Sequence, residues 1–239
     1  MKLPLSNRLL ACASFVLPGD RVADVGCDHG YLGIYLLKNG VASSVIASDV
    51  KEGPLQSALR NAEKYDVKDK MRFYLSDGVR GIPKDFDCLI CAGMGADTMI
   101  SILEAALWLR SSQYRLILQC QSKTPSLRQY LSESGWRIAE ETVLRDGRFL
   151  YTVMEVQWDP SYPRLTPGQW HFPPALLENP GSEVPAYYRR VVNGLKIAVT
   201  GRGEAAGSTL NTCLAELEAL PENNNLSWLT EEHEHDNRG

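Results

Sequence analysis

The sequence predicts an α/β fold: a mostly parallel, doubly wound sheet that ends in an antiparallel hairpin and is followed by a small helical extension. Three observations support this prediction. Residues 22–32 combine a β-branched run, a turn with two glycines and a helix-forming segment. Apolar runs typical of buried strands then alternate with helical patterns up to residue 132. Finally, two strand patterns flank Asp146-Gly147, a typical hairpin turn.

The composition is that of an ordinary globular chain. Of its 239 residues, 44% are hydrophobic and 23% are charged. No apolar run approaches the roughly 20 residues that span a bilayer, and residues 1–6 lack the layout of a signal peptide. We therefore expect a cytoplasmic monomer with no membrane contact. The net charge of −4 argues only weakly against nucleic acid, because phosphate binding needs a local basic face.

The six cysteines lie mostly within apolar runs. Cys88 and Cys91 have the CxxC spacing, but no second pair and no suitable histidine cluster accompanies them. They also fall within an expected buried strand. The prediction is therefore that they serve as small apolar residues, with no metal site.

The expected elements alternate along the first 156 residues. A lead-in helix over residues 3–17, with Ser6 as its N-cap, precedes the first strand. The expected strands cover residues 21–28, 44–50, 71–75, 87–92 and 115–120, followed by the two hairpin strands within 136–156. The expected helices cover residues 31–39, 55–65, 97–109 (with Asp97 as N-cap) and 124–132.

Beyond residue 158 the composition changes. Residues 159–221 begin with a proline-rich stretch that cannot hold a long helix, followed by helical patterns at 184–202 and 208–220. The first of these contains no acidic residue. Its four cations could form a basic face for RNA or, alternatively, a solvated surface: Arg189, Arg190, Lys196 and Arg202. Residues 222–239 are polar and acidic and are predicted to be disordered.

Candidate binding residues fall at the carboxyl ends of the expected strands, where ligands bind in sheets of this kind. Asp49 lies about twenty residues beyond the glycine turn, the position of a carboxylate that accepts hydrogen bonds from ribose hydroxyls. Asp77 could meet the exocyclic amine of an adenine, although Asp-Gly is equally a plain turn signal. Met94, in a loop between glycines, could offer an apolar face to a base or serve simple packing.

Five collinear motifs identify a family. They are Leu5-Ser6-x-Arg8-Leu9, Ala23-Asp24-Val25-Gly26-Cys27-Asp28-His29-Gly30-Tyr31-Leu32, Asp77-Gly78, Ala92-Gly93-Met94-Gly95 and Leu116-Ile117-Leu118-Gln119. In order and spacing they resemble the bacterial tRNA (adenine-22-N1)-methyltransferases over residues 1–157. The resemblance implies a Rossmann-like class I methyltransferase domain over residues 1–158, S-adenosylmethionine as cofactor, and tRNA as substrate.

The resemblance also assigns roles to residues. It implies that Asp28 is catalytic, and it implies a cofactor site to which we add Arg8 and Gln119 as candidates. The expected cofactor contacts are Arg8, Gly26, Asp28, His29, Asp49, Asp77, Gly78, Gly93, Met94 and Gln119. After residue 158 the resemblance fades: the family has a long antiparallel helical hairpin there, and shorter helices are expected here.

Asp28 has two possible roles. Because N1 of adenine has an in-plane lone pair, it can attack a methyl donor without first losing a proton. A carboxylate at the edge of the base would stabilise the positive charge that grows on the ring. Alternatively, Asp28 caps the helix that follows it, a role that aspartate often fills.

Three other functions are open. The cofactor could serve another RNA site or a small molecule, or the chain could be a non-catalytic RNA- or protein-binding module. The acidic residues at the three strand ends argue against loss of catalysis. A dinucleotide oxidoreductase is disfavoured by the terminal hairpin and because residue 28 is not glycine.

Overall fold

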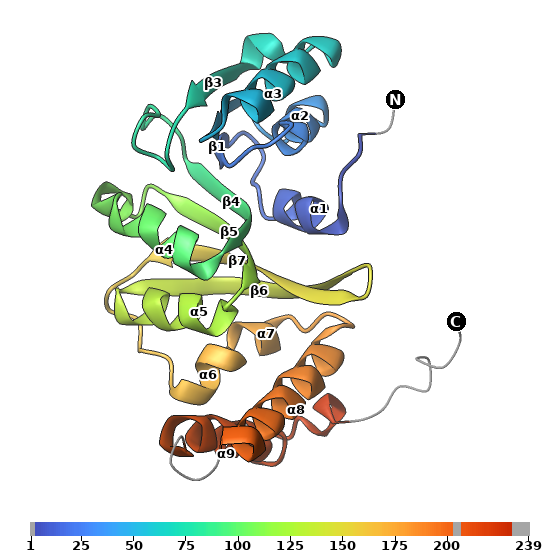
Figure 1. Cartoon of the computed structure of the whole chain (residues 1–239), viewed down its shortest axis with the longest axis vertical. Helices are drawn as coiled ribbons and strands as arrows, with labels where there is room; N and C mark the ends of the chain where they lie inside the picture. Colours follow the sequence, from blue (N-terminus) through green and yellow to red (C-terminus); the bar gives the residue numbers. More distant parts are fainter. Residues whose placement is uncertain (1–2, 203–206, 231–239) are drawn as a thin grey trace.

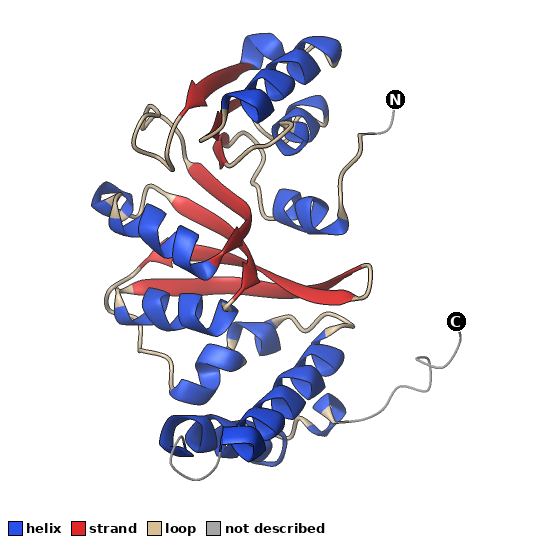
Figure 2. Cartoon of the chain, in the orientation of Figure 1, coloured by secondary structure: helices blue, strands red, loops and turns tan. Residues whose placement is uncertain are grey.

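The computed structural model of the chain describes residues 3–202 and 207–230. It contains one seven-stranded sheet flanked by helices, followed by an all-helical part beside the terminal hairpin (Figures 1 and 2). The strands are β1 (Arg21–Val25), β2 (Ser44–Asp49), β3 (Met71–Leu75), β4 (Cys88–Gly95), β5 (Arg115–Ser122), β6 (Trp136–Asp146) and β7 (Phe149–Trp158). The helices of the sheet region are α1 (Asn7–Ser14), α2 (Tyr31–Lys38), α3 (Glu52–Lys64), α4 (Ala96–Glu104) and α5 (Thr124–Glu133), with 3-10 turns η1 (Lys68–Lys70) and η2 (Leu107–Leu109).

The strand order is β3-β2-β1-β4-β5-β7-β6. The first five strands in the sequence are parallel, and β7 joins antiparallel to both β5 and β6. The predicted fold class is therefore confirmed, terminal hairpin included. The order reverses between β1 and β4, which places a crevice beyond their carboxyl ends.

The helices cover both faces of the sheet. Buried side chains of α1, α2 and α3 pack on one face and those of α4 and α5 on the other. The parallel strands between them carry near-continuous apolar runs because both of their faces are buried. Ser6 caps α1 as predicted, its side chain accepting a hydrogen bond from the Leu9 amide at 3.4 Å.

Two local predictions are wrong. The helix expected over residues 97–109 ends at Glu104 and is followed by the separate turn η2, and its N-cap is Gly95. Asp97 lies in the first turn instead, where its carboxylate pairs with Lys123 at 2.7 Å. The substitution of a long-range ion pair for a cap could not be foreseen from local sequence.

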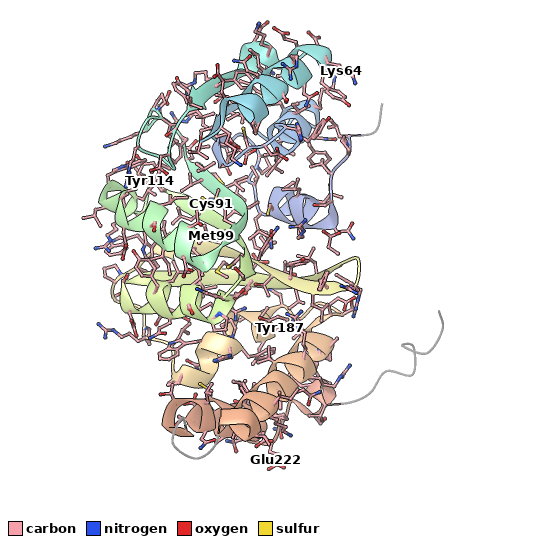
Figure 3. The ribbon with its side chains drawn as sticks, viewed as in Figure 1. Lys64, Cys91, Met99, Tyr114, Tyr187 and Glu222 are labelled. Atoms are coloured by element: carbon pink, nitrogen blue, oxygen red, sulfur yellow. The ribbon has the colours of Figure 1, made fainter. Side chains whose placement is uncertain are left out.

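The C-terminal part is helical and packs as a unit. It contains α6 (Pro167–His171), α7 (Ala175–Glu178), α8 (Val184–Arg202), α9 (Gly207–Asn223) and the turn η4 (Ser227–Leu229). Most of its buried apolar residues form a core of their own that also includes Val143 and Leu150 of the hairpin, whereas Ala175 of α7 belongs to the core of the sheet region. In Figure 3 Tyr187, which is buried in this core, lies where the hairpin meets these helices.

One expectation for this part is confirmed and another is corrected. The helices predicted over residues 184–202 and 208–220 are present as α8 (Val184–Arg202) and α9 (Gly207–Asn223). The expected disorder from residue 222 is wrong as far as residue 230, because α9 continues to Asn223 and Leu229 is fully buried. Apolar residues at 226 and 229 supply the anchor. Residues 231–239 lie outside the described part of the chain.

All six cysteines are buried and free. Burial raises the pKa of the Cys91 thiol to about 12, so Cys91 stays protonated and behaves as a small apolar side chain. Within residues 3–202 and 207–230, no group of three or more His, Cys, Asp or Glu residues is placed to hold a metal ion.

None of the helices in the described residues is both long enough and apolar enough to cross a membrane.

Candidate functional site

A cavity of about 410 Å³ opens at the carboxyl edge of the sheet, where the strand order reverses. We call it the first cavity. It lies over the ends of β1, β2 and β4 and the turn after β3, so it brings together residues far apart in sequence. Seven of the predicted site residues line it: Gly26, Asp28, Asp49, Asp77, Gly78, Gly93 and Met94.

Asp49 organises the wall between β1 and β2. Its Oδ2 accepts a hydrogen bond from the Asp28 amide at 3.2 Å, and its Oδ1 accepts one from the Lys51 amide at 2.9 Å. The carboxylate thus holds both the turn after β1 and the turn after β2. Each oxygen has further acceptor capacity, so both can also meet hydroxyl donors in the cavity.

Gly26 must be glycine for two reasons. Its φ is +73°, in the left-handed region that residues with a side chain rarely occupy. In addition, a Cβ built there would overlap the Cε methyl of Met94. Met94 therefore packs directly over the glycine turn, and its position depends on the missing side chain.

The turn after β3 forms another wall. Ser76 shapes it: the Ser76 hydroxyl donates to the Gly78 carbonyl at 2.9 Å and accepts from the Gly81 amide at 3.0 Å. Asp77 is mostly exposed, and its carboxylate pairs with Arg80 at 3.0 Å. The turn and ligand interpretations of Asp77-Gly78 are both compatible with this geometry.

A second cavity of about 290 Å³ adjoins the first. The two share Gly26, Asp28, Ala92 and Gly93 in their linings. The remaining predicted cofactor residues, Arg8, His29 and Gln119, line the second cavity and not the first. The predicted set is thus divided between two adjoining cavities that meet at Asp28.

Arg8 is held by the hairpin. Its Nε donates to Asp146 at 2.7 Å, and its guanidinium lies 5.0 Å from the centre of the Tyr151 ring. Helix α1 is thereby fixed over the second cavity. The contact between Arg8 and a cofactor stays a prediction.

Gln119 acts on the protein backbone. Its Oε1 accepts from the Gly93 amide at 3.1 Å and its Nε2 donates to the Cys120 carbonyl at 3.2 Å, with 1% of the residue exposed. The side chain therefore fixes the Gly93 loop, and its effect on a ligand would be exerted through that loop.

Asp28 does not cap the following helix. The N-cap position of α2 is Gly30, and Asp28 itself has a φ of +49°. Its side chain is 70% exposed, and one carboxylate oxygen lies 3.6 Å from Nε2 of His29. The alternative capping role is therefore wrong, and the exposed carboxylate belongs to a residue that lines both cavities.

Asp24 is a site residue that sequence reasoning did not assign. It lines the second cavity and is 4% exposed. Burial, together with the nearby charge of Asp49, raises the pKa of Asp24 to about 7. The sequence did carry one sign of this role, because an acidic residue within a buried strand, two residues before the glycine turn, lies close to a ligand site.

The apolar wall of the first cavity was also missed. It comes from Val50, Val79 and Ile102, with Thr98 and Ser101 beside them. Ile102 lies on α4, and its side chain packs against Gly78, which lines the same cavity. Helical periodicity places such a residue on a buried face but gives no sign that a cavity lies there.

The predicted RNA-binding residues on α8 have mixed environments. Arg190 donates to the Leu150 carbonyl at 3.0 Å, and Lys196 pairs with Glu218 of α9 at 2.9 Å. Arg189 is partly buried, and the side chain of Arg202 lies outside the described part. The absence of acidic residues within residues 184–202 did not exclude an acidic partner on the next helix.

Comparisons of the sequence and the structure with known proteins match this chain to methyltransferases. The family model for the methyltransferase domain matches residues 5–154. The chain is 33% identical over 154 residues to the tRNA (adenine(22)-N(1))-methyltransferase of Bacillus subtilis, covering 64% of this chain and 65% of that relative. The chain thus matches just under two thirds of the length of that curated relative.

Solved structures extend the likeness. A Bacillus subtilis m1A22 tRNA methyltransferase has a TM-score of 0.74 and 27% identity, covering 96% of this chain and all of that one. A Streptococcus pneumoniae protein, a candidate tRNA (m1A22) methyltransferase in complex with S-adenosyl-L-methionine, has a TM-score of 0.78 and 29% identity, covering 90% and 99%. The expectation that the likeness ends near residue 158 is therefore wrong for the three-dimensional structure. The chain belongs to the methyltransferase-domain family, and its predicted resemblance to the bacterial tRNA (adenine-22-N1)-methyltransferases is confirmed.

Proposed function

We propose that the chain transfers a methyl group from S-adenosylmethionine to N1 of an adenine in tRNA, with adenine 22 as the expected acceptor. The observation that carries this proposal is the meeting of two cavities at Gly26, Asp28, Ala92 and Gly93. A methyl transfer needs two ligands in contact, and adjoining cavities offer a place for each. The names of the relatives in the comparisons support the same reaction.

The first cavity fits the cofactor. Its volume is within the range of roughly 300–1,000 Å³ that is usual for small-molecule sites. Asp49 would accept hydrogen bonds from the ribose hydroxyls, and Asp77 would face the adenine amine. Val79 and Ile102 would contact the apolar faces of the adenine ring. Bound S-adenosylmethionine supplies the methyl group that is transferred.

The second cavity would receive the acceptor base. Because N1 lies on the Watson–Crick edge, a paired adenine must leave its helix before it can enter. Asp28 stands at the junction, so its carboxylate would stabilise the positive charge that develops on the base. Gln119 would hold the Gly93 loop at a fixed distance from that junction.

The RNA would extend beyond the cavities over the surface of the chain. The net charge of −4 does not oppose this, because Arg148 and Arg190 lie on or beside the hairpin and its neighbouring helices. We expect the reaction to take place in the cytoplasm and the protein to act as a monomer.

The test is methyl transfer to unmodified tRNA, with the methylated nucleotide mapped by the arrest of reverse transcription. We expect one arrest, at adenine 22, and its loss when that adenine is replaced by guanine. Labelled nucleosides and small metabolites serve as competing acceptors. Transfer to a different RNA position would correct the acceptor, transfer only to a small molecule would exclude tRNA, and cofactor binding without any transfer would indicate a binding module.

A further inference from the structure

A third cavity, of about 230 Å³, continues from the second. Gln121 lines both of them. The walls of the third cavity come from the start of β7, the beginning of α5 and the Tyr187–Arg190 side of α8. A polymer whose base occupies the second cavity could therefore place its adjoining backbone in the third.

The cavity has the groups that bind an anion. Helix α5 begins here with Thr124 in the lining, and no side chain of the described residues caps its N-terminus. Pro125 has no N–H, and the Ser126 amide donates to the Lys123 carbonyl at 2.9 Å, so the Thr124 amide is the donor that this end offers to a ligand. The amide groups at a helix N-terminus carry partial positive charge. Among the nine described residues that line the cavity, Arg190 alone is charged. Its Nη1 donates to the Leu150 carbonyl at 3.0 Å, which leaves the other N–H donors of the guanidinium for a ligand.

An independent observation comes from Thr152. This residue lines the same cavity and is 2% exposed, and its Oγ1 has no hydrogen-bond partner in the part of the chain that the structure describes. A buried hydroxyl without a partner destabilises the protein. Valine has the same shape and is common in strands, so a threonine here gains nothing from packing alone. A ligand oxygen in the cavity would supply the missing partner.

The flank of the cavity suits nucleic acid. Phe149 and Tyr151 line it, and the Phe149 side chain is among the exposed large apolar residues, at 49%. An exposed aromatic ring beside a cation is a stacking surface for a base. No carboxylate is present among the nine lining residues to repel a phosphate.

We propose that the third cavity binds a backbone phosphodiester of the RNA, next to the nucleotide that enters the second cavity. This inference rests on the proposed function. Arg190, the Thr152 hydroxyl and the N-terminus of α5 would each donate to phosphate oxygens. The subsite would fix the register of the RNA, so that one particular nucleotide reaches Asp28.

The test uses the full chain, unmodified tRNA and two single variants. Thr152→Val removes only the hydroxyl, and we expect the KM for tRNA to rise roughly tenfold. The thermal midpoint should stay the same or rise, because the unpartnered hydroxyl is gone. Arg190→Gln should raise the KM for tRNA and reduce the salt slope of tRNA binding by about one unit. The KM for S-adenosylmethionine should not change in either variant.

Two matched variants serve as controls. Thr142→Val removes a hydroxyl from the neighbouring strand; Thr142 pairs with Val153, so its side chain lies on the opposite face from that of Thr152. The guanidinium of Arg190 lies 5.1 Å from the centre of the Tyr187 ring, and that of Arg110 lies 5.2 Å from the centre of the Trp158 ring, so Arg110→Gln removes an arginine in a similar setting. Arg110 follows η2 and precedes β5, so it lies at the end of β5 opposite the third cavity. Both controls should keep the wild-type KM for tRNA.

The outcomes separate the two proposals. A Thr152→Val variant with a wild-type KM for tRNA would overturn the phosphodiester site and leave the methyl transfer intact. A change in the KM for the cofactor instead of tRNA would also overturn it. A wild-type protein that methylates no tRNA would overturn the proposed function, and with it this inference.

Discussion

Arg128 of α5 and Glu141 of β6 form an ion pair in which neither side chain is exposed, with 2.6 Å between Nη2 and Oε1. The guanidinium also donates from Nη1 to the carbonyls of Trp170 and His171, at 3.0 Å each, and from Nη2 to the hydroxyl of Tyr187. Every contact beyond Glu141 belongs to the C-terminal helices or the segment that leads into them. One side chain therefore joins the methyltransferase domain to its extension.

Removal of Arg128 should be strongly destabilising. The Arg128→Ala variant leaves a buried carboxylate and two part-buried carbonyls without their partner, and we expect a loss of about 3–5 kcal/mol in the free energy of unfolding. Urea denaturation, followed by tryptophan fluorescence, measures this loss. The C-terminal extension should separate from the methyltransferase domain first, because Arg128 joins the two. Trp170 and Trp228 belong to the extension, so their fluorescence reports this step.

The control is Arg145→Ala, which removes an exposed ion pair with Glu183 between the hairpin and the segment before α8. Its effect should be much smaller, because exposed pairs are screened by solvent. The double variant Arg128→Met, Glu141→Leu should recover part of the lost stability, because no unpaired buried charge remains. A loss in Arg128→Ala no larger than that of the control would contradict the joining role.

Asp24 predicts a pH dependence of stability. Burial raises the pKa of Asp24 in the folded chain to about 7, from the ordinary value of 3.8, and the nearby charge of Asp49 adds to this. Between these values the folded state keeps a proton that the unfolded chain has released, so this residue destabilises the fold as pH rises from about 4 to 7. The slope reaches at most about 1.4 kcal/mol per pH unit and disappears above pH 7.

The measurement compares the wild type with Asp24→Asn, which cannot ionise. Urea midpoints at several pH values give the difference in unfolding free energy between the two proteins. That difference should favour the variant increasingly from pH 4 to pH 7 and then level off. A constant difference across this range would mean that the carboxyl group titrates normally.

The sequence predicts the parts of the site that depend on chain order. Asp49 and Gly26 follow from strand–turn–helix spacing, because a parallel sheet brings the ends of successive strands to one edge. Sheet topology then places Gly93 beside them, since β4 pairs with β1. The terminal hairpin was predictable because Asp-Gly specifies a tight turn between two alternating runs.

What the sequence could not give is the use made of individual polar side chains. Arg128 has the sequence context of an exposed helical arginine, yet it is fully buried because Glu141 and three C-terminal acceptors surround it. Asp97 has the context of a cap and pairs instead with Lys123. Such roles depend on partners brought close by tertiary folding, and local patterns carry no record of them.

Gly26→Ala should weaken cofactor binding more than it affects stability. The new Cβ would displace the Met94 methyl into the first cavity, and the positive φ adds a backbone cost of about 1–2 kcal/mol. Gly40→Ala is a matched control, because Gly40 has a φ of +65° and open space around its Cβ position. The two variants should lose similar stability in thermal denaturation. Calorimetry should then show reduced S-adenosylmethionine affinity in Gly26→Ala alone, and equal affinities would mean that Met94 moves away from the ligand.

The last prediction concerns Asp28, whose capping role the structure excludes. Asp28 has a φ of +49°, a conformation that asparagine tolerates better than most residues, so Asp28→Asn removes the charge with little strain. The Asp28 amide, which donates to Asp49, is retained. We expect kcat for tRNA to fall roughly a hundredfold, as for the loss of one preorganised electrostatic group.

Two further readouts separate catalysis from folding and binding in Asp28→Asn. The thermal midpoint should stay within a few degrees of the wild-type value, because the carboxylate is exposed and its close side-chain neighbour among the described residues is His29, at 3.6 Å. Asp77→Asn is the comparison: its side chain lines only the first cavity of the two, so it should raise the KM for S-adenosylmethionine and leave kcat near normal. If Asp28→Asn turned over tRNA at the wild-type rate, the charge at the junction would have no part in the chemistry, and Asp28 would only shape the turn.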